Sequence, residues 1–201
     1  MRRIVDLLIG VPALIILGPT ILALGVAVRL ESPGGPFFRQ ARVGKDGVEF
    51  TMLKLRSMRA GRDETGTVMG GRVDPRVTRT GAFLRKTHLD ELPQLLNVVR
   101  GDMTLIGPRP EVPDFVAHYT PAQREVLRVR PGITGPGQVE YATRWEPLLD
   151  GAADANQVYL DLVMGPKLEL ELDYVRHRSL AADVRIIRET VDGLLGTLAR
   201  R

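Results

Sequence analysis

The chain has 201 residues, a formal charge of +4 and a pI of about 9.7. Its length allows one domain with a core, and the absence of cysteine excludes thiolate nucleophiles, Cys-ligated zinc and disulfides. Only four of the 28 basic residues are lysine. Such an arginine excess suits phosphate and anionic-lipid partners, although codon bias in a GC-rich genome produces the same ratio.

The first predicted element is an apolar helix at the N-terminus. From Ile4 to Val28 the only charged residue is Asp6, and a helix of this length covers about 37 Å, against a bilayer core of about 30 Å. A cleavable signal peptide is the first alternative. The apolar run is longer than a signal-peptide core, and no clean cleavage site follows it.

This apolar segment is predicted to enter and leave the membrane on the same face. Gly18 and Pro19 interrupt it, and Pro19 removes an N–H and clashes with the carbonyl of Ile15, which predicts a kink. Basic residues, which prefer the cytoplasmic side, flank both ends. They are Arg2 and Arg3 before the segment, and Arg29, Arg39, Arg42 and Lys45 after it. A kinked helix that spans the bilayer remains the alternative.

A short β-hairpin and a long loop come next. Residues 37–42 and 48–55 flank a turn that contains Asp46 and Gly47, a pair that supplies the positive φ of a tight hairpin. The stretch from Ala60 to Thr80 is rich in Gly, Arg, Asp and Thr and has no apolar periodicity. It is predicted to be a long loop, either functional or disordered.

Two further helices are predicted from apolar residues at three- and four-residue spacing. The first has about three turns over 89–99, with Thr87 as the N-cap candidate, Pro93 near its first turn and Gly101 beyond its end. The second covers about 180–198. Its apolar face either lies on the membrane surface or packs against the core.

The strongest candidates for chemistry are two adjacent carboxylates, Asp90 and Glu91, in a basic segment. A helix start stabilises anions and would keep a carboxylate ionised. Neighbouring helical residues point about 100° apart, which favours different roles for the two groups. The structural alternative is a capping box from Thr87 to Asp90. No Walker-type loop, hydrolase triad motif or zinc-ligand spacing occurs.

The run from Gly81 to Met103, GAFLRKTHLDELPQLLNVVRGDM, resembles the signature of the bacterial sugar transferases, the monotopic phosphoglycosyl transferases. Further blocks agree in order and cover nearly the whole chain. They are FFRQ-x-RVG from Phe37, KLRSM from Lys54, DPRVT from Asp74, GPRP from Gly107 and RPGITG from Arg130.

The resemblance implies a ping-pong reaction. Asp90 attacks the sugar-linked phosphate of a UDP-sugar, expels UMP and holds the phosphosugar until polyprenyl (undecaprenyl) phosphate accepts it. Mg²⁺ is the implied cofactor, with Asp90 and Glu91 as its ligands. The implied phosphate-binding residues are Lys54, Arg56, Arg85, Arg109 and Arg144, and the implied structural residues are Gly18, Pro19, Pro108 and Pro110.

The expected fold is α+β and mostly helical: a re-entrant membrane helix over residues 1–30, then a short β-hairpin and a small catalytic domain with interfacial amphipathic helices over 31–201. The expected location is the cytoplasmic face of the bacterial inner membrane, in contact with membrane lipids, with a homodimer as an option and no nucleic-acid partner. Two departures from the family pattern are Gly18 where Ser is common and the segment from Pro136 to Arg144. The second leaves the role of Arg144 and the sugar specificity open.

Two other hypotheses compete with the transferase. A membrane-tethered basic module would bind nucleic acid or anionic lipid, but aromatic residues are only 5% of the chain and the two carboxylates would repel a phosphate backbone. A catalytically inactive scaffold of the same fold is the third hypothesis, based on the altered segment from Gln138 to Arg144.

Overall fold

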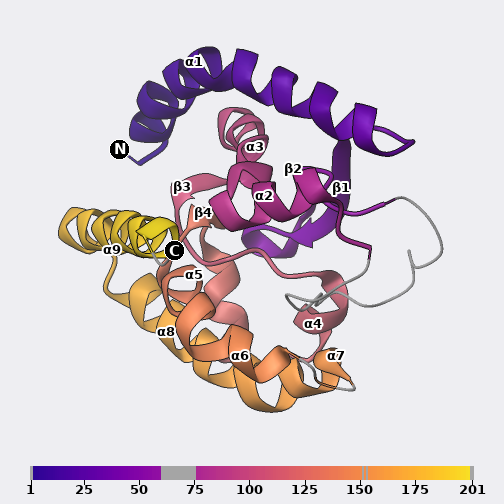
Figure 1. Cartoon of the computed structure of the whole chain (residues 1–201). Coiled ribbons are helices and arrows are strands. Elements are labelled where there is room, and N and C mark those ends of the chain that lie inside the picture. The colour runs from indigo at the N-terminus through magenta and orange to yellow at the C-terminus, as the bar shows by residue number, and fades with distance from the viewer. Residues whose placement is uncertain (1, 60–75, 151, 153, 200–201) are drawn as a thin grey trace.

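The computed structural model describes residues 2–59, 76–150, 152 and 154–199, and Figure 1 shows how their elements are arranged. Part of the predicted 60–80 loop, residues 60–75, therefore lies outside the described residues. The helices are α1 (Arg2–Glu31), α2 (Arg79–Thr87), α3 (Gln94–Arg100), α4 (Pro113–Ala117), α5 (Pro136–Glu140), α6 (Glu146–Leu149), α7 (Ala155–Val158), α8 (Met164–Arg176) and α9 (Leu180–Ala199). The strands are β1 (Phe37–Val43), β2 (Glu49–Leu55), β3 (Thr104–Ile106) and β4 (Gly132–Thr134).

The apolar N-terminal segment forms one helix, α1, of 30 residues. Pro12 and Pro19 both lie inside it, and Figure 1 shows α1 arching over the rest of the molecule. Its most apolar stretch has a mean hydropathy of 2.4 and is only 11% buried, so α1 is long and apolar enough to cross a membrane and is unlike the core helix of a soluble protein. Large side chains such as Leu8, Ile16 and Leu22 are about two-thirds exposed.

The N-terminal end of α1 is attached to the domain below it by polar contacts. Arg3 donates hydrogen bonds to the carbonyls of Val98 and Val99 at the end of α3. The Asp6 carboxylate is buried and accepts hydrogen bonds from the Thr104 hydroxyl, at 2.8 and 2.9 Å, and from a backbone N–H of β3. The one charged residue of the apolar run is therefore satisfied by protein.

The C-terminal end of α1 is attached to the same domain. Glu31 accepts hydrogen bonds at 2.8 Å from the backbone N–H groups of Arg79 and Thr80, in the first turn of α2. Val28 is buried in a cluster with Leu55 of β2 and Leu84 of α2. Both ends of the apolar helix thus lie on one globular unit.

The predicted hairpin is confirmed. β1 and β2 pair antiparallel with Phe37 opposite Leu55 and Val43 opposite Glu49. Asp46 and Gly47 in the connecting turn both have positive φ, 58° and 79°. The turn therefore fixes the register of the hairpin, and the register determines on which face of the hairpin Lys54, near the end of β2, lies.

The segment that carries the two carboxylates is more broken than predicted. An unpredicted helix, α2, is capped by the Thr78 side chain, and Thr87 ends it rather than starting the next. The Thr87 hydroxyl donates to carbonyls of the preceding turn, so both the N-cap and the capping-box interpretations are wrong. His88 then adopts a left-handed conformation, φ 55°, and a 3₁₀ turn, η2 (Leu89–Glu91), precedes α3. The predicted end at Gly101 is confirmed.

The rest of the domain packs around a small parallel pair, β3 and β4. Gly107 and Gly132 meet there, and a Cβ on Gly132 would lie 2.1 Å from the Gly107 nitrogen, so no larger residue fits. A second core gathers α4, α6 and α8 around Trp145, Tyr159 and Leu168. The fold is mostly helical with two small sheets, in agreement with the expected class.

The predicted C-terminal helix is α9, and its apolar face is exposed rather than packed on the core. Ile186 and Asp183 are buried on its opposite side. The exposed side chains are Leu180, Val184, Ile187, Val191 and Leu195, at 46–66% exposure.

Candidate active site

Glu91 is held between two cations that come from distant parts of the sequence. Its Oε1 accepts a hydrogen bond from Lys54 Nζ of β2 at 2.7 Å and another from Arg109 Nη2 at 3.0 Å. The three side chains are 15–29% exposed. Low exposure makes these ion pairs stronger than surface pairs. The structure therefore brings together three of the residues singled out in the sequence.

Asp90 lies next to this cluster but has a different environment. It is 8% exposed, and no hydrogen bond from another described residue reaches its carboxylate. The two acids thus have different surroundings, and the prediction that they have different roles stays a prediction. Glu91 is fixed by Lys54 and Arg109, whereas the Asp90 carboxylate is not tied to a side chain of the described part of the chain.

The electrostatics of the two carboxylates also diverge. Burial raises the pKa of Asp90, and the Lys54 charge opposes that shift. Burial also disfavours the charged form of Glu91, but the Lys54 and Arg109 charges outweigh burial and hold the pKa of Glu91 well below its ordinary value. The Glu91 charge in turn raises the pKa of Arg109. The expectation that a helix start would favour ionised Asp90 is wrong, because Asp90 lies in a short, buried 3₁₀ turn.

β2 is fixed to α3 beside the cluster by Asn97, which the sequence analysis missed. This fully buried side chain accepts a hydrogen bond from Leu53 N at 3.1 Å and donates to the Thr51 carbonyl at 2.8 Å. Both are backbone groups of β2. Asn97 therefore sets the position of the strand that carries Lys54 relative to the helix that follows Glu91.

Arg109 lies on a loop whose backbone carbonyls accept hydrogen bonds on both sides of it. The Pro108 carbonyl accepts from Gly132 N at 2.8 Å, and the Pro110 carbonyl accepts from the Arg42 guanidinium at 2.9 Å. Both prolines are buried and fix φ on either side of Arg109. The structural role expected of Pro108 and Pro110 stays a prediction.

Beneath Arg109 is a buried charged network that the sequence analysis did not find. Lys167 forms a short ion pair with Glu111 and lies 3.9 Å from Glu171, and Glu111 also accepts from the Tyr159 hydroxyl. Glu171 accepts a hydrogen bond from the backbone N–H of Arg109 at 3.1 Å. These residues are at most 4% exposed, so the network supports the Arg109 loop from below. One feature of the sequence could have pointed to this network: Lys167 is one of only four lysines.

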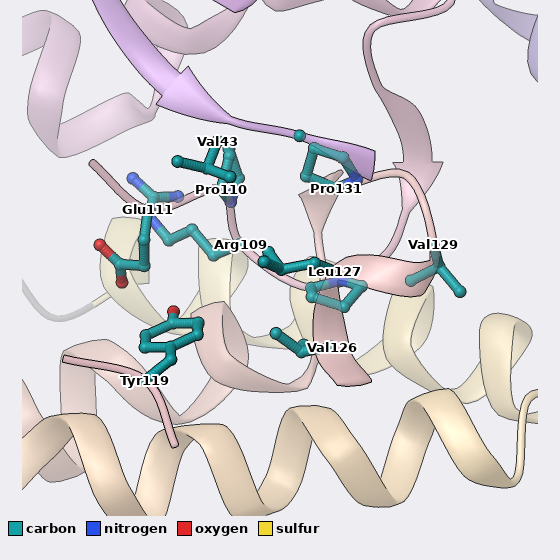
Figure 2. Close-up of a pocket in the computed structure, with 11 residues that line it drawn as sticks. Val43, Arg109, Pro110, Glu111, Tyr119, Val126, Leu127, Val129 and Pro131 are labelled. Atoms are coloured by element: carbon teal, nitrogen blue, oxygen red, sulfur yellow. The ribbon is translucent and has the colours of Figure 1, made fainter. Parts of the chain in front are cut away.

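Figure 2 shows the pocket on this side of the Arg109 loop. The Tyr119 hydroxyl points toward Glu111, and Val126, Leu127 and Pro131 close the apolar side. Its free space is about 10 Å³, room for no more than about one water. This pocket is therefore too small for a phosphate-bearing ligand.

The other predicted phosphate-binding residues differ in their contacts and exposure. Arg85, in the last turn of α2, donates from Nε to the Ser57 hydroxyl at 2.9 Å, and α2 packs against the 3₁₀ turn of Asp90. Arg56 donates to three backbone carbonyls, those of residues 32, 33 and 35, and so holds the loop after α1. Arg144 is exposed, with its guanidinium 5.9 Å from the centre of the Trp145 ring.

The described carboxylates do not complete a magnesium site by themselves. Among the described residues no group of three or more His, Asp or Glu side chains gathers around one point. Mg²⁺ is commonly held by one or two carboxylates together with substrate phosphates and waters. Asp90 and the Oε2 atom of Glu91 fit that pattern, because the Lys54 and Arg109 contacts use Oε1.

Two adjacent acids beside a basic cluster, in a domain that carries a long and exposed apolar helix, are consistent with a membrane-associated enzyme. The chain belongs to the bacterial sugar transferase family, whose profile matches residues 1–197.

Characterised relatives agree with this assignment. The chain is 39% identical over 199 residues to the UDP-glucose:undecaprenyl-phosphate glucose-1-phosphate transferase of Xanthomonas campestris, covering 97% of this chain and 39% of that protein. It is 37% identical over 199 residues to a Caulobacter vibrioides protein of the same name, covering 98% and 70%. An Aeromonas hydrophila relative, 38% identical over 96% of this chain and 43% of its own length, is named for N-acetylgalactosamine. The chain thus spans about two fifths of the Xanthomonas and Aeromonas proteins.

Proposed function

We propose that the protein transfers a sugar 1-phosphate from a UDP-sugar to undecaprenyl phosphate, releasing UMP and forming undecaprenyl-diphosphate-sugar. The observation that carries this proposal is the Asp90 carboxylate, buried and free of hydrogen bonds from the described residues, beside the Lys54–Glu91–Arg109 cluster. The names of the relatives support the acceptor and the reaction type. The relatives differ in the sugar that they are named for, so the donor sugar is left open.

The proposed chemistry has two steps at one phosphorus. An Asp90 oxygen bonds to the sugar-linked phosphorus, and the bond from that phosphorus to the bridging oxygen breaks, so UMP leaves with the electron pair. An oxygen of undecaprenyl phosphate then bonds to the same phosphorus, and the bond to Asp90 breaks and restores the carboxylate. UMP departs before the acceptor reacts, which makes the order ping-pong.

The surrounding residues have separate tasks in this proposal. Arg109 and Lys54 supply positive charge for the phosphate oxygens, and Glu91 holds both cations in position. Arg85 extends the basic surface from α2. A bound Mg²⁺, held by Asp90 and Glu91, would neutralise charge on the phosphates during the displacement.

The membrane arrangement that we infer is re-entrant, with the catalytic domain on the cytoplasmic face. Arg3 and Asp6 near one end of α1, and Glu31 at the other, all bond to the same domain. A helix with both ends on one side of the bilayer satisfies these contacts, whereas a straight spanning helix would separate them. The exposed apolar face of α9 would then rest on the same membrane surface.

The test is a search for the covalent intermediate. The purified chain is incubated with a UDP-sugar and no acceptor, and its intact mass and peptide masses are measured. We expect one added phosphosugar on Asp90, with one UMP released per adduct. Asp90→Asn should form no adduct, while the surface control Asp173→Asn, 75% exposed, should behave like the native chain. Full turnover by Asp90→Asn would refute the mechanism.

A panel of UDP-sugars assayed for UMP release identifies the donor and separates the alternatives. Release with any natural UDP-sugar dismisses the inactive scaffold. Steeply salt-dependent DNA binding with no UMP release would instead favour the basic binding module.

A further inference from the structure

A second basic cleft lies away from the carboxylates, at the start of α1. It forms where α1, the beginning of β3, the segment before β4 and the turn between α8 and α9 meet, and it has about 150 Å³ of free space. None of its residues belongs to the Lys54–Glu91–Arg109 cluster. The lining residues are Arg2, Asp6, Lys45, Thr104, Arg128, Val129, Arg130 and Arg178.

The cleft is strongly positive. Five of its side chains are basic, and its single carboxylate, Asp6, is already used by the hydroxyl of Thr104 and a backbone N–H of β3. Arg2 has its own partner, Asp183, at 2.6 Å. The cleft therefore concentrates positive charge that its own acid does not neutralise.

Two arginines of the cleft have no acidic partner among the described residues. Within the described ranges, neither Arg130 nor Arg178 has a carboxylate within 4.0 Å, and Arg128 reaches Glu125 only at that limit. Arg178 lies over the Tyr174 ring, 5.7 Å from its centre, and its buried Nε has no hydrogen-bond acceptor among the described residues. A buried donor without an acceptor is costly, which points to a ligand that supplies one.

The two helices that start beside this cleft, α1 and α9, also carry exposed apolar side chains. On α1, Ile4 is 62% and Leu8 is 70% exposed; on α9, Leu180 is 65% and Val184 is 66% exposed. The ion pair between Arg2 and Asp183 joins the starts of these two helices. A basic cleft next to exposed apolar helices suits a phosphate group at the boundary between water and hydrocarbon.

We propose that this cleft binds the phosphate of an anionic phospholipid, whose acyl chains lie along the exposed face of α1. Guanidinium groups suit a phosphodiester because their fork donates two parallel hydrogen bonds. The small volume admits a headgroup phosphate rather than a sugar nucleotide. The proposal rests on the membrane placement of α1 but not on the transfer chemistry.

The test compares two double variants that remove equal charge. The full chain, in neutral detergent and without UDP-sugar, is titrated with phosphatidylglycerol in phosphatidylcholine mixed micelles, and bound lipid is counted by native mass spectrometry. We expect saturable binding of phosphatidylglycerol over phosphatidylcholine. Arg128→Gln/Arg178→Gln should weaken it about tenfold or more. The control Arg185→Gln/Arg188→Gln, on the exposed surface of α9, should change it by less than about twofold.

A single substitution controls for misfolding, and three results would refute the proposal. Arg128→Gln alone, at a side chain that is 78% exposed, guards against misfolding and should weaken binding about threefold. Equal loss in the control variant would indicate general surface attraction and refute the cleft. Displacement of the lipid by millimolar inorganic phosphate would refute a lipid-specific site in favour of free phosphate, as would equal binding of the two lipids. Because no donor sugar is present, failure of the proposed transfer reaction leaves this result readable.

Discussion

Replacing Glu91 by glutamine tests whether the cluster beside Asp90 is held as the structure shows. The substitution keeps the shape but replaces the charged acceptor of two hydrogen bonds, from Lys54 at 2.7 Å and Arg109 at 3.0 Å, by a neutral one. Loss of the charge on one partner weakens each hydrogen bond by about 1 kcal/mol, so the loss over both bonds is about 2 kcal/mol. For a chain of this size, that predicts a fall in Tm of about 4–8 °C.

Thermal unfolding in detergent measures this loss, and a surface pair provides the matched control. Glu125 accepts two hydrogen bonds from Arg176, but those side chains are 28% and 51% exposed. Glu125→Gln should therefore lower Tm by less than about 2 °C. If Glu91→Gln unfolds at the same temperature as the native chain, the Lys54–Glu91–Arg109 cluster does not exist in solution as described.

The pH dependence gives a second readout of the same substitution. The pKa of Glu91 in the folded chain lies below its ordinary value of about 4.5, so its contribution is full above that pH and is lost as the pH falls below it. The difference in Tm between the native chain and Glu91→Gln should therefore shrink below about pH 4.5. Asp90 has a raised pKa and the opposite sign; burial, the main cause of that shift, acts in both chains, and only the smaller contribution of the Glu91 charge remains in the difference. A difference that grows in acid would contradict the assigned ion pairs.

Two further substitutions test packing and charge. Gly81→Ala would place a Cβ 1.9 Å from the Ser57 carbonyl and should destabilise the protein by about 1–3 kcal/mol. The control Gly18→Ala, whose Cβ would have nothing within 4 Å, should be neutral or stabilising by up to about 1 kcal/mol. Equal Tm values for the two variants would refute the contact between α2 and Ser57. Lys167→Met would leave Glu171 without its lysine partner and Glu111 with only Arg42, at 3.6 Å, costing about 3–5 kcal/mol. A variant with native Tm and UMP release would refute the network as support for the site.

The features predicted correctly from the sequence have local causes. The hairpin depends on the Asp46–Gly47 turn, the end of α3 depends on Gly101, and α1 depends on its own apolar run. The adjacency of Asp90 and Glu91 is also local, whereas their separate environments depend on Lys54 and Arg109. These signals are contained within a few residues of the chain.

The features that were missed depend on contacts between distant residues. The helix before Asp90 has no apolar periodicity over its nine residues, and it is held by the Thr78 cap and by close packing of Gly81 on Ser57. The break at His88 interrupts what had been predicted as a single helix start. Lys167 reaches Glu111 across 56 positions, a pairing that no spacing in the sequence indicates.

The two attached ends of α1 have a consequence for how the protein matures. Asp6 accepts a hydrogen bond from β3, and Glu31 accepts one from the first turn of α2. Without the apolar helix, these backbone donors of the water-facing part would lose their acceptors. For a helix inserted as proposed, entry into the lipid and closure of the catalytic part become a single cooperative event. Newly made chains should therefore acquire protease resistance only when a bilayer is supplied during synthesis.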